Sequence, residues 1–272
     1  MEWKYDISAC TLCPRECGVD RLNGVRGRCG CDSDIYVARA ALHNWEEPCI
    51  SGVRGSGTVF FSGCPLGCVF CQNSNIANAK VGKKIPVERL AEIFLEQQDR
   101  GALNINLVTP THYIPQIIKA LELSKRQGMN LPVVYNSGGY EKAEALKLLD
   151  GLVDVYLPDM KYMSPGLAGK YSKAQDYPAA AMAALTEMFR QVGTPVFEVE
   201  NPDDNTATDE AGLIMKRGMI VRHLVLPGCT ADSKAVVKYL YDTYGDDIYM
   251  SIMSQYTPQG GMTRTSPGMT YI

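Results

Sequence analysis

Three cysteines close together on one loop are the residues of this sequence with the clearest chemistry. Cys64, Cys68 and Cys71 stand at C-x3-C-x2-C spacing in GTVFFSGCPLGCVFCQN, directly after a short apolar run and with no fourth cysteine close by. Thiolates select zinc, copper(I) or iron–sulfur clusters, and a structural zinc site normally has a fourth protein ligand. A [4Fe-4S] cluster takes one thiolate per iron, so three cysteines leave one iron open. An open iron can bind a substrate or cofactor directly, and the spacing therefore predicts a catalytic cluster.

A second group of cysteines predicts a closed metal site near the N-terminus. Cys10, Cys13, Cys17 and Cys29 follow a C-x2-C-x3-C-x11-C pattern in a glycine-rich stretch, and Cys31 is an alternative fourth ligand. Four cysteines suit structural zinc, which would staple a segment too small for its own core, and they equally suit an auxiliary iron–sulfur cluster. The sequence leaves both metals open.

These cysteines must be positioned by regular elements, and the chain past residue 55 alternates between short apolar runs and longer amphipathic segments. The runs are rich in β-branched and aromatic residues and are bounded by Gly, Pro, Asn or Asp, which predicts strands at 58–62, 104–109, 132–136, 153–157, 195–200, 221–226 and 248–253. Helical periodicity predicts helices between most of them, at 86–100, 115–127, 140–149, 178–191 and 231–244. Repeated strand-then-helix order predicts parallel strands joined by crossover helices.

The expected fold is an α/β fold, a partial (β/α) TIM-type barrel with a small N-terminal cysteine-rich metal-binding segment. We expect the segment to span residues 1–50 and the barrel residues 51–272. Barrels of this kind carry their chemistry at the C-terminal ends of the strands, and polar or glycine-rich residues follow each predicted strand. The Cys64 loop follows the first strand, so the metal and the polar residues after the other strands, Asn201 to Asp204 among them, should share one mouth.

Composition limits the remaining possibilities. The 272 residues are 46% apolar and 21% charged, enough for a full-sized core, and the formal net charge is −3. This charge gives no reason to expect nucleic acid or an anionic membrane as a partner. The sequence has no signal peptide and no apolar run long enough to cross a bilayer, so we expect a cytoplasmic protein. In a reducing cytosol, ten cysteines are better explained by metals than by disulfides.

The cysteine loop also carries a resemblance. C-x3-C-x2-C with an aromatic residue, Phe70, before the last cysteine resembles the signature of the radical S-adenosylmethionine superfamily. Residues 46–73 together with INLVTPTHY, DVYLPDMKY, RHLVLPG and MSQYTP are similar to the branch related to pyruvate formate-lyase activating enzyme. The resemblance implies a [4Fe-4S] cluster on Cys64, Cys68 and Cys71, with S-adenosylmethionine on the open iron. It implies reductive cleavage of that cofactor to a 5′-deoxyadenosyl radical, and an electron donor such as flavodoxin or ferredoxin.

The resemblance also implies residues that bind S-adenosylmethionine. Activating enzymes carry a Ser-Gly-Gly-Glu turn after the second strand, where this sequence has Val108 to Thr111; backbone carbonyls and the Thr109 or Thr111 hydroxyl are expected to accept hydrogen bonds from the methionyl ammonium in its place. Asn136 and Ser137 are expected at the ribose hydroxyls or the methionyl carboxylate.

Later strands supply further candidates. Asp159 and Lys161 match an Asp-x-Lys of the activating enzymes, in which the lysine pairs with the carboxylate. Arg222 or His223, and Gln255, are candidates from the last two strands. His112 is a possible proton donor at the rim, and the tyrosines of residues 156–177 are a possible lid over the barrel mouth.

Three functions fit these features. The first is an activase-like enzyme that removes hydrogen from a backbone glycine of a partner protein. The second is a radical enzyme that acts on a small molecule or modifies a peptide. The third is a non-catalytic metalloprotein whose N-terminal cysteine segment binds a partner or nucleic acid, and the low net positive charge and the open cysteine triad count against it.

Overall fold

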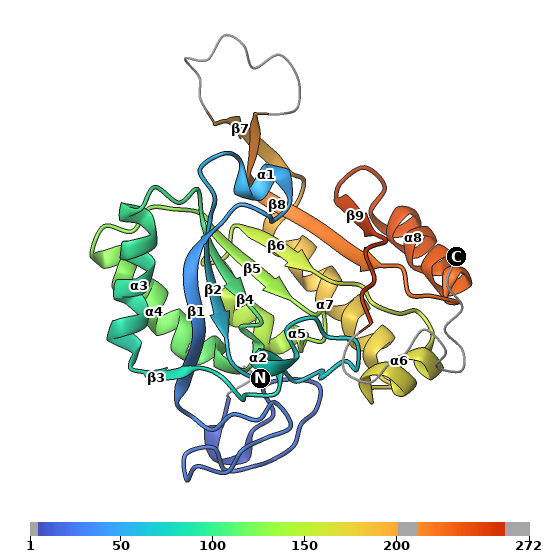
Figure 1. The fold of residues 1–272 in the computed structure, drawn as a ribbon, viewed down its shortest axis with the longest axis horizontal. Coiled ribbons are helices and arrows are strands. Elements are labelled where there is room, and N and C mark those ends of the chain that lie inside the picture. The colour runs from blue at the N-terminus through green and yellow to red at the C-terminus, as the bar shows by residue number, and fades with distance from the viewer. Residues whose placement is uncertain (1–4, 201–211, 259–272) are drawn as a thin grey trace.

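A curved, mostly parallel sheet forms the centre of the molecule in the computed structural model, which describes residues 5–200 and 212–258 (Figure 1). Within these residues the sheet has nine strands in the order β3-β1-β2-β4-β5-β6-β8-β7, and β9 pairs with β8. The strands are β1 (Ile35–His43), β2 (Ser56–Phe61), β3 (Lys83–Ile85), β4 (Ile105–Val108), β5 (Val133–Ser137), β6 (Val155–Pro158), β7 (Val196–Val199), β8 (Leu213–Leu224) and β9 (Tyr249–Met253). Strands β2, β4, β5, β6, β8 and β9 are parallel neighbours in chain order. This is the predicted partial barrel.

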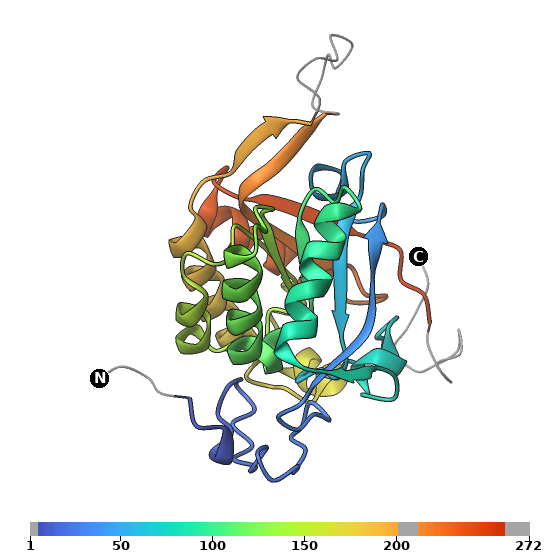
Figure 2. The same cartoon turned by 90° about the vertical axis from the view of Figure 1, so that its left-hand side faces the viewer.

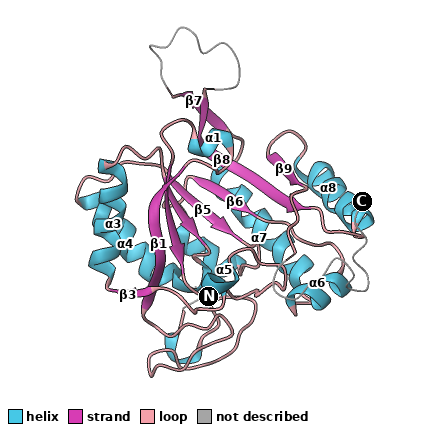
Figure 3. Ribbon diagram, in the orientation of Figure 1, coloured by secondary structure: helices cyan, strands magenta, loops and turns pink. Residues whose placement is uncertain are grey.

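Helices connect the parallel strands and cover the outer face of the sheet (Figures 2 and 3). They are α1 (Pro48–Ser51), α2 (Ser74–Ala77), α3 (Val87–Asp99), α4 (Ile114–Arg126), α5 (Ala143–Leu146), α6 (Pro165–Ser172), α7 (Tyr177–Val192) and α8 (Thr230–Tyr244). Helix α4 shows why they pack there, because Ile114, Ile117 and Leu121 fall on one face at helical spacing and all three are fully buried. Four predicted helices are confirmed in α3, α4, α7 and α8, whereas the helix predicted at 140–149 is one turn of α5 followed by a 3-10 turn at Lys147–Leu149.

Strand β7 corrects the expectation that every predicted strand is parallel and ends at the barrel mouth. Its register pairs Val199 with Leu213 and Val196 with Arg217, so β7 runs antiparallel to the first part of β8. The second part of β8, from Gly218 onward, pairs with β6 and β9. Because β8 is 12 residues long, it extends past the barrel and carries β7 as a hairpin away from the mouth, at the top of Figure 1. Residues 201–204 lie outside the described residues.

Strands β1 and β3 were not predicted. Strand β1 lies at residues 35–43, within the predicted N-terminal segment, and pairs antiparallel with both β2 and β3. It covers the edge of the first parallel strand, which would otherwise present unpaired backbone groups.

The cysteine segment before β1 is almost free of regular structure and lies at the bottom of Figure 1, next to the end of β2. Two arginines hold it in place. Arg21 is 1% exposed, and its Nε donates to the Asp32 carbonyl at 2.9 Å. Arg15 donates to four backbone carbonyls, at Pro65 and Leu66 and at residues 172 and 173. Among the described residues, no helix is both long and apolar enough to cross a membrane.

Candidate functional site

The loop that carries the cysteine triad begins with a backbone turn that requires glycine. Gly63 has φ +91°, and a Cβ atom at this position would lie 2.4 Å from Cys31 Sγ and 2.6 Å from the Cys29 carbonyl oxygen. The turn allows Cys64 N to donate to that same carbonyl at 3.2 Å. The chain therefore leaves β2 and passes directly against the N-terminal cysteine segment before it enters the triad.

Cys64, Cys68 and Cys71 all line one cavity of about 300 Å³ at the C-terminal ends of the parallel strands. Burial, and then the neighbouring Cys68 thiol, raise the pKa of Cys64 to about 12, and burial also raises the pKa of Cys71. A metal centre would provide the strong local positive charge that favours the thiolate form of Cys64 and Cys71 against these raised pKa values. The cavity has room beside the cysteines for a cofactor, so the residues present fit a three-thiolate cluster with an open position.

Within the described residues, no group of three Cys, His, Asp or Glu side chains is already arranged to hold one metal ion. A cubane cluster does not require such convergence, because each of its thiolates binds a different iron. The three cysteine sulfurs around the cavity are therefore compatible with a cluster and unlike a preformed single-ion site.

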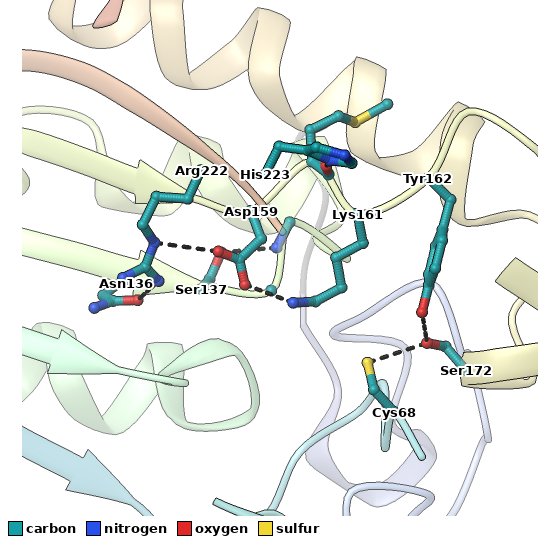
Figure 4. Close-up of polar contacts among 12 residues, drawn as sticks. Cys68, Asn136, Ser137, Asp159, Lys161, Tyr162, Ser172, Arg222 and His223 are labelled. Carbon is teal, nitrogen blue, oxygen red and sulfur yellow. Dashed lines mark hydrogen bonds and ion pairs between the residues drawn. The ribbon is translucent and has the colours of Figure 1, made fainter. Parts of the chain in front are cut away.

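Aromatic and hydroxyl side chains hold the triad loop from the side of α6. Ser172 donates to Cys68 Sγ at 3.0 Å, and the Tyr162 hydroxyl in turn donates to Ser172 Oγ at 2.8 Å (Figure 4). Phe70 packs edge-on against Tyr162 and Tyr171, at centroid distances of 6.4 and 6.3 Å. The tyrosines of residues 156–177 are thus buried packing residues, at most 5% exposed, and the interpretation of this segment as a lid is wrong.

Charged side chains from β8 and from the segment directly after β6 form the floor of the cavity. Asp159 lies between two cations: Arg222 Nε is 3.1 Å from its Oδ1, and Lys161 Nζ is 2.6 Å from its Oδ2 (Figure 4). Burial alone would raise the pKa of the Asp159 carboxyl, but the two cations outweigh burial and hold that pKa below its usual value. Burial by itself would lower the pKa of Lys161, but the neighbouring Asp159 carboxylate outweighs burial and raises that pKa. All three groups are therefore charged at neutral pH.

Glu46 binds the side chains of this floor without lining the cavity itself, and it was missed as a site residue. Its Oε1 accepts from Arg222 Nη1 at 3.0 Å, and its Oε2 accepts from the Asn106 and Asn136 amides at 2.9 and 3.0 Å. Asn136 also accepts from Arg222 Nη2 at 2.6 Å. Glu46 lies just before α1 and is 176 residues from Arg222, so neither spacing nor periodicity could have joined the two.

The two threonines after β4 face different ways. Thr109 lines the cavity and has a left-handed backbone with φ +57°, which costs a β-branched residue roughly 1–3 kcal/mol. Its N–H donates to the Asn136 carbonyl at 2.8 Å. Thr111 is 2% exposed, and its hydroxyl donates to Glu141 Oε1 at 2.6 Å, behind the cavity wall.

The remaining predicted site residues also divide into those that line the cavity and one that does not. Ser137 and Gln255 line the cavity, and the exposed Gln255 lies at its rim. His223 lies between β8 and α8, where its ring nitrogens are 2.7 Å from the Met160 carbonyl and 2.8 Å from Ser233 Oγ. These contacts occupy both nitrogens, and His223 is therefore structural in this arrangement.

The N-terminal cysteines surround a second, much smaller cavity. Cys10, Cys13, Cys17 and Cys29 all line a space of about 10 Å³. Cys31 does not line this cavity; its Sγ donates to the Ser62 carbonyl at 3.2 Å and also lies beside the Cys29 thiol. Of the two predicted alternatives for the fourth cysteine, Cys29 is the one that shares a cavity with the other three.

A barrel of parallel strands with a cysteine triad after the first of them defines a class of proteins, and sequence comparison agrees with it. The family model of the radical SAM superfamily, where SAM is S-adenosylmethionine, matches residues 58–208, more than half of the chain. The chain therefore belongs to this superfamily, and membership implies a [4Fe-4S] cluster and S-adenosylmethionine.

A relative of the chain was also found. An uncharacterized protein of Methanocaldococcus jannaschii is 29% identical over 263 residues, which cover 92% of this chain and 66% of the relative. The chain thus spans slightly less than two thirds of the relative's length.

Proposed function

We propose that Cys64, Cys68 and Cys71 hold the three ligated irons of the cluster, and that the amino and carboxylate groups of S-adenosylmethionine bind the fourth. The observation that carries this proposal is that the three thiols share one cavity with Asn136, Asp159 and Lys161. When bound, the cluster and S-adenosylmethionine together supply a 5′-deoxyadenosyl radical that removes hydrogen from a substrate.

The remaining work of the site belongs to the side chains of the chain itself. Lys161, fixed by Asp159 at 2.6 Å, supplies a positive charge for the methionyl carboxylate. Thr109, at the cavity wall, is better placed than Thr111 to accept hydrogen bonds from the ammonium group. Asn136 and Ser137 offer hydrogen bonds to the ribose or the carboxylate. Arg222 holds Asp159 and Asn136 in position from below, and Gln255 contacts the cofactor at the rim.

We further propose that the substrate is a backbone glycine of a partner protein, as in activating enzymes. The six parallel strands of the described chain form an incomplete barrel, and β9 is paired with β8 alone. An incomplete barrel leaves space for a partner loop to reach the cavity. A small-molecule or peptide substrate is the alternative outcome.

The test is anaerobic reconstitution with iron and sulfide, followed by dithionite and S-adenosylmethionine, with 5′-deoxyadenosine as the readout. Cys68→Ala is expected to lose product formation, whereas Cys49→Ala is expected to keep it, since Cys49 packs against a separate apolar cluster. If the parent chain releases no 5′-deoxyadenosine under these conditions, the proposed chemistry is wrong.

The substrate class needs its own experiment. A stable glycyl radical signal on a co-purified partner, dependent on the chain and on S-adenosylmethionine, supports the activase. Hydrogen transfer into a small molecule or peptide with no such signal supports the alternative. Flavodoxin or ferredoxin replacing dithionite in the same assay would identify the electron donor.

A further inference from the structure

The small cavity lined by the N-terminal cysteines is also lined by a residue from the barrel, His112. His112 belongs to the 3-10 turn Thr111–Tyr113 that follows β4, and it is 2% exposed. The cavity thus has walls from two parts of the chain, and one of them is an imidazole. Imidazole and thiolate are the two ligand types that zinc combines most often in proteins.

The contacts of His112 fix which of its nitrogens carries hydrogen. Nε2 lies 2.7 Å from the Ser62 carbonyl oxygen, and a carbonyl only accepts, so Nε2 is the donor. Nδ1 is buried and has no hydrogen-bond partner within the described part of the chain. A protonated Nδ1 would be a buried donor without an acceptor, so the ring is neutral and Nδ1 presents a bare lone pair. Leaving such a buried acceptor unsatisfied costs about 1–3 kcal/mol.

This pattern is that of a metal-ligating histidine. Such a residue commonly donates its other N–H to a backbone carbonyl, which fixes the tautomer and orients the ring toward the metal. The Ser62 carbonyl fills that role here, because it holds Nε2.

A buried cation beside the cysteines points to a negatively charged site. Arg21 lines the same cavity and is 1% exposed. Within the described residues its guanidinium meets the Asp32 backbone carbonyl, the Tyr5 hydroxyl at 3.4 Å and Cys10 Sγ at 3.9 Å, and no carboxylate. Arginine is rarely so buried without a compensating charge. Three thiolates, one divalent ion and a neutral imidazole carry a net charge of −1, which the charge of Arg21 balances.

We propose that the N-terminal site binds a single zinc ion through Cys10, Cys13, Cys29 and Nδ1 of His112. The three cysteines are buried, whereas Cys17 is exposed. The cavity of about 10 Å³ has the room of roughly one water molecule, which suits a single ion. Within the part of the chain that the structure describes, these side chains are not already arranged around one point, so the proposed site requires the three sulfurs to move toward Nδ1 when the ion binds.

The site proposed here is distinct from the cluster cavity, and its test does not depend on radical chemistry. In the full chain carrying Cys64→Ala, Cys68→Ala and Cys71→Ala, all absorbance and metal come from the N-terminal site. We expect one zinc per chain in this background. After exchange to cobalt(II), we expect a tetrahedral visible spectrum with sulfur-to-cobalt charge-transfer bands.

The decisive variant is His112→Gln, because the glutamine amide can still donate to the Ser62 carbonyl while it lacks a nitrogen in the place of Nδ1. We expect zinc affinity to fall at least tenfold and the cobalt spectrum to change, with far-UV circular dichroism unaltered. Cys17→Ser is the matched control and is expected to keep both zinc and spectrum. Full zinc binding by His112→Gln overturns the proposal, and so does loss of zinc from Cys17→Ser or reconstitution of an iron–sulfur cluster at this site. If His112→Gln does not fold, the cobalt spectrum of the background chain decides, since a spectrum of four sulfur ligands overturns the proposal.

Discussion

The charged floor of the cavity gives the most informative test of how the fold holds its site, through the change Arg222→Met. Arg222 compensates two carboxylates at once, with contacts of 3.0 Å to Glu46 and 3.1 Å to Asp159, and its side chain is 15% exposed. After the change, Asp159 keeps Lys161 as a partner, but Glu46 keeps only amide donors. The main cost is therefore one uncompensated carboxylate that is 11% exposed.

Removing one partner of a buried ion pair costs about 3–5 kcal/mol. Because the side chains here border a cavity and two amides still bind Glu46, we expect the lower end of that range, about 3 kcal/mol. The assay is urea-induced unfolding followed by far-UV circular dichroism, on full chains prepared identically without oxygen.

Two further variants test the reasoning. Adding Glu46→Gln to Arg222→Met is expected to restore at least half of the loss, because the second change removes the charge left without a partner. Lys238→Met is the control, since Lys238 pairs with Asp242 on the surface at 76% and 55% side-chain exposure, and no resolvable change is expected. A loss below about 1 kcal/mol for Arg222→Met, or no recovery in the double variant, would refute the account of the floor.

Three other predictions concern single residues. Burial raises the pKa of Glu141 to about 7, above its unfolded value near 4.5, so its contribution to stability is full below about pH 4.5 and is lost as the pH rises through about 7. Glu141→Gln is expected to gain about 2–3 kcal/mol relative to the parent between pH 5 and 8 in urea titrations, and equal pH slopes would contradict this. The hydrogen bond from Ser172 to Cys68 Sγ favours the reduced cluster, which is the more negative form. Ser172→Ala removes this bond, so a potentiometric titration should show a reduction potential lower by a few tens of millivolts. An unchanged potential argues against Cys68 as a ligand. Gly63→Ala is expected to lower the free energy of unfolding by roughly 1–3 kcal/mol more than Gly245→Ala does. Both glycines have a left-handed φ, but only at Gly63 would the added Cβ lie closer than 3 Å to other atoms. Equal losses of stability in urea unfolding would show that the loop relaxes.

Much of the barrel was predictable because local patterns decide it. The apolar runs and helical periodicity gave the parallel strands and four of the helices, and the cysteine spacing gave the family. Strand β7 shows the limit, since alternation identifies a strand but not its direction, and its antiparallel pairing depends on how far β8 extends past the barrel.

The sequence identified the cysteines of the site more reliably than its polar residues. A position after a strand does not reveal which way a side chain turns, and Thr109 and Thr111 face opposite sides of one wall for that reason. Glu46 reaches the floor by tertiary packing alone. For His112, the signal was present as one of three histidines beside a strand end, but its carbonyl partner and its bare nitrogen are visible only in three dimensions.

Hydrogen bonds from Arg15 to backbone carbonyls connect the two cysteine-bearing stretches of the chain. Arg15 belongs to the N-terminal segment, yet its guanidinium binds the triad loop at Pro65 and Leu66 and the end of α6 at Ser172. Whatever orders the N-terminal segment therefore also orders the loop that receives the cluster. For the proposed N-terminal metal we therefore expect insertion before the oxygen-sensitive cluster, which would be assembled on a loop that is already held in place.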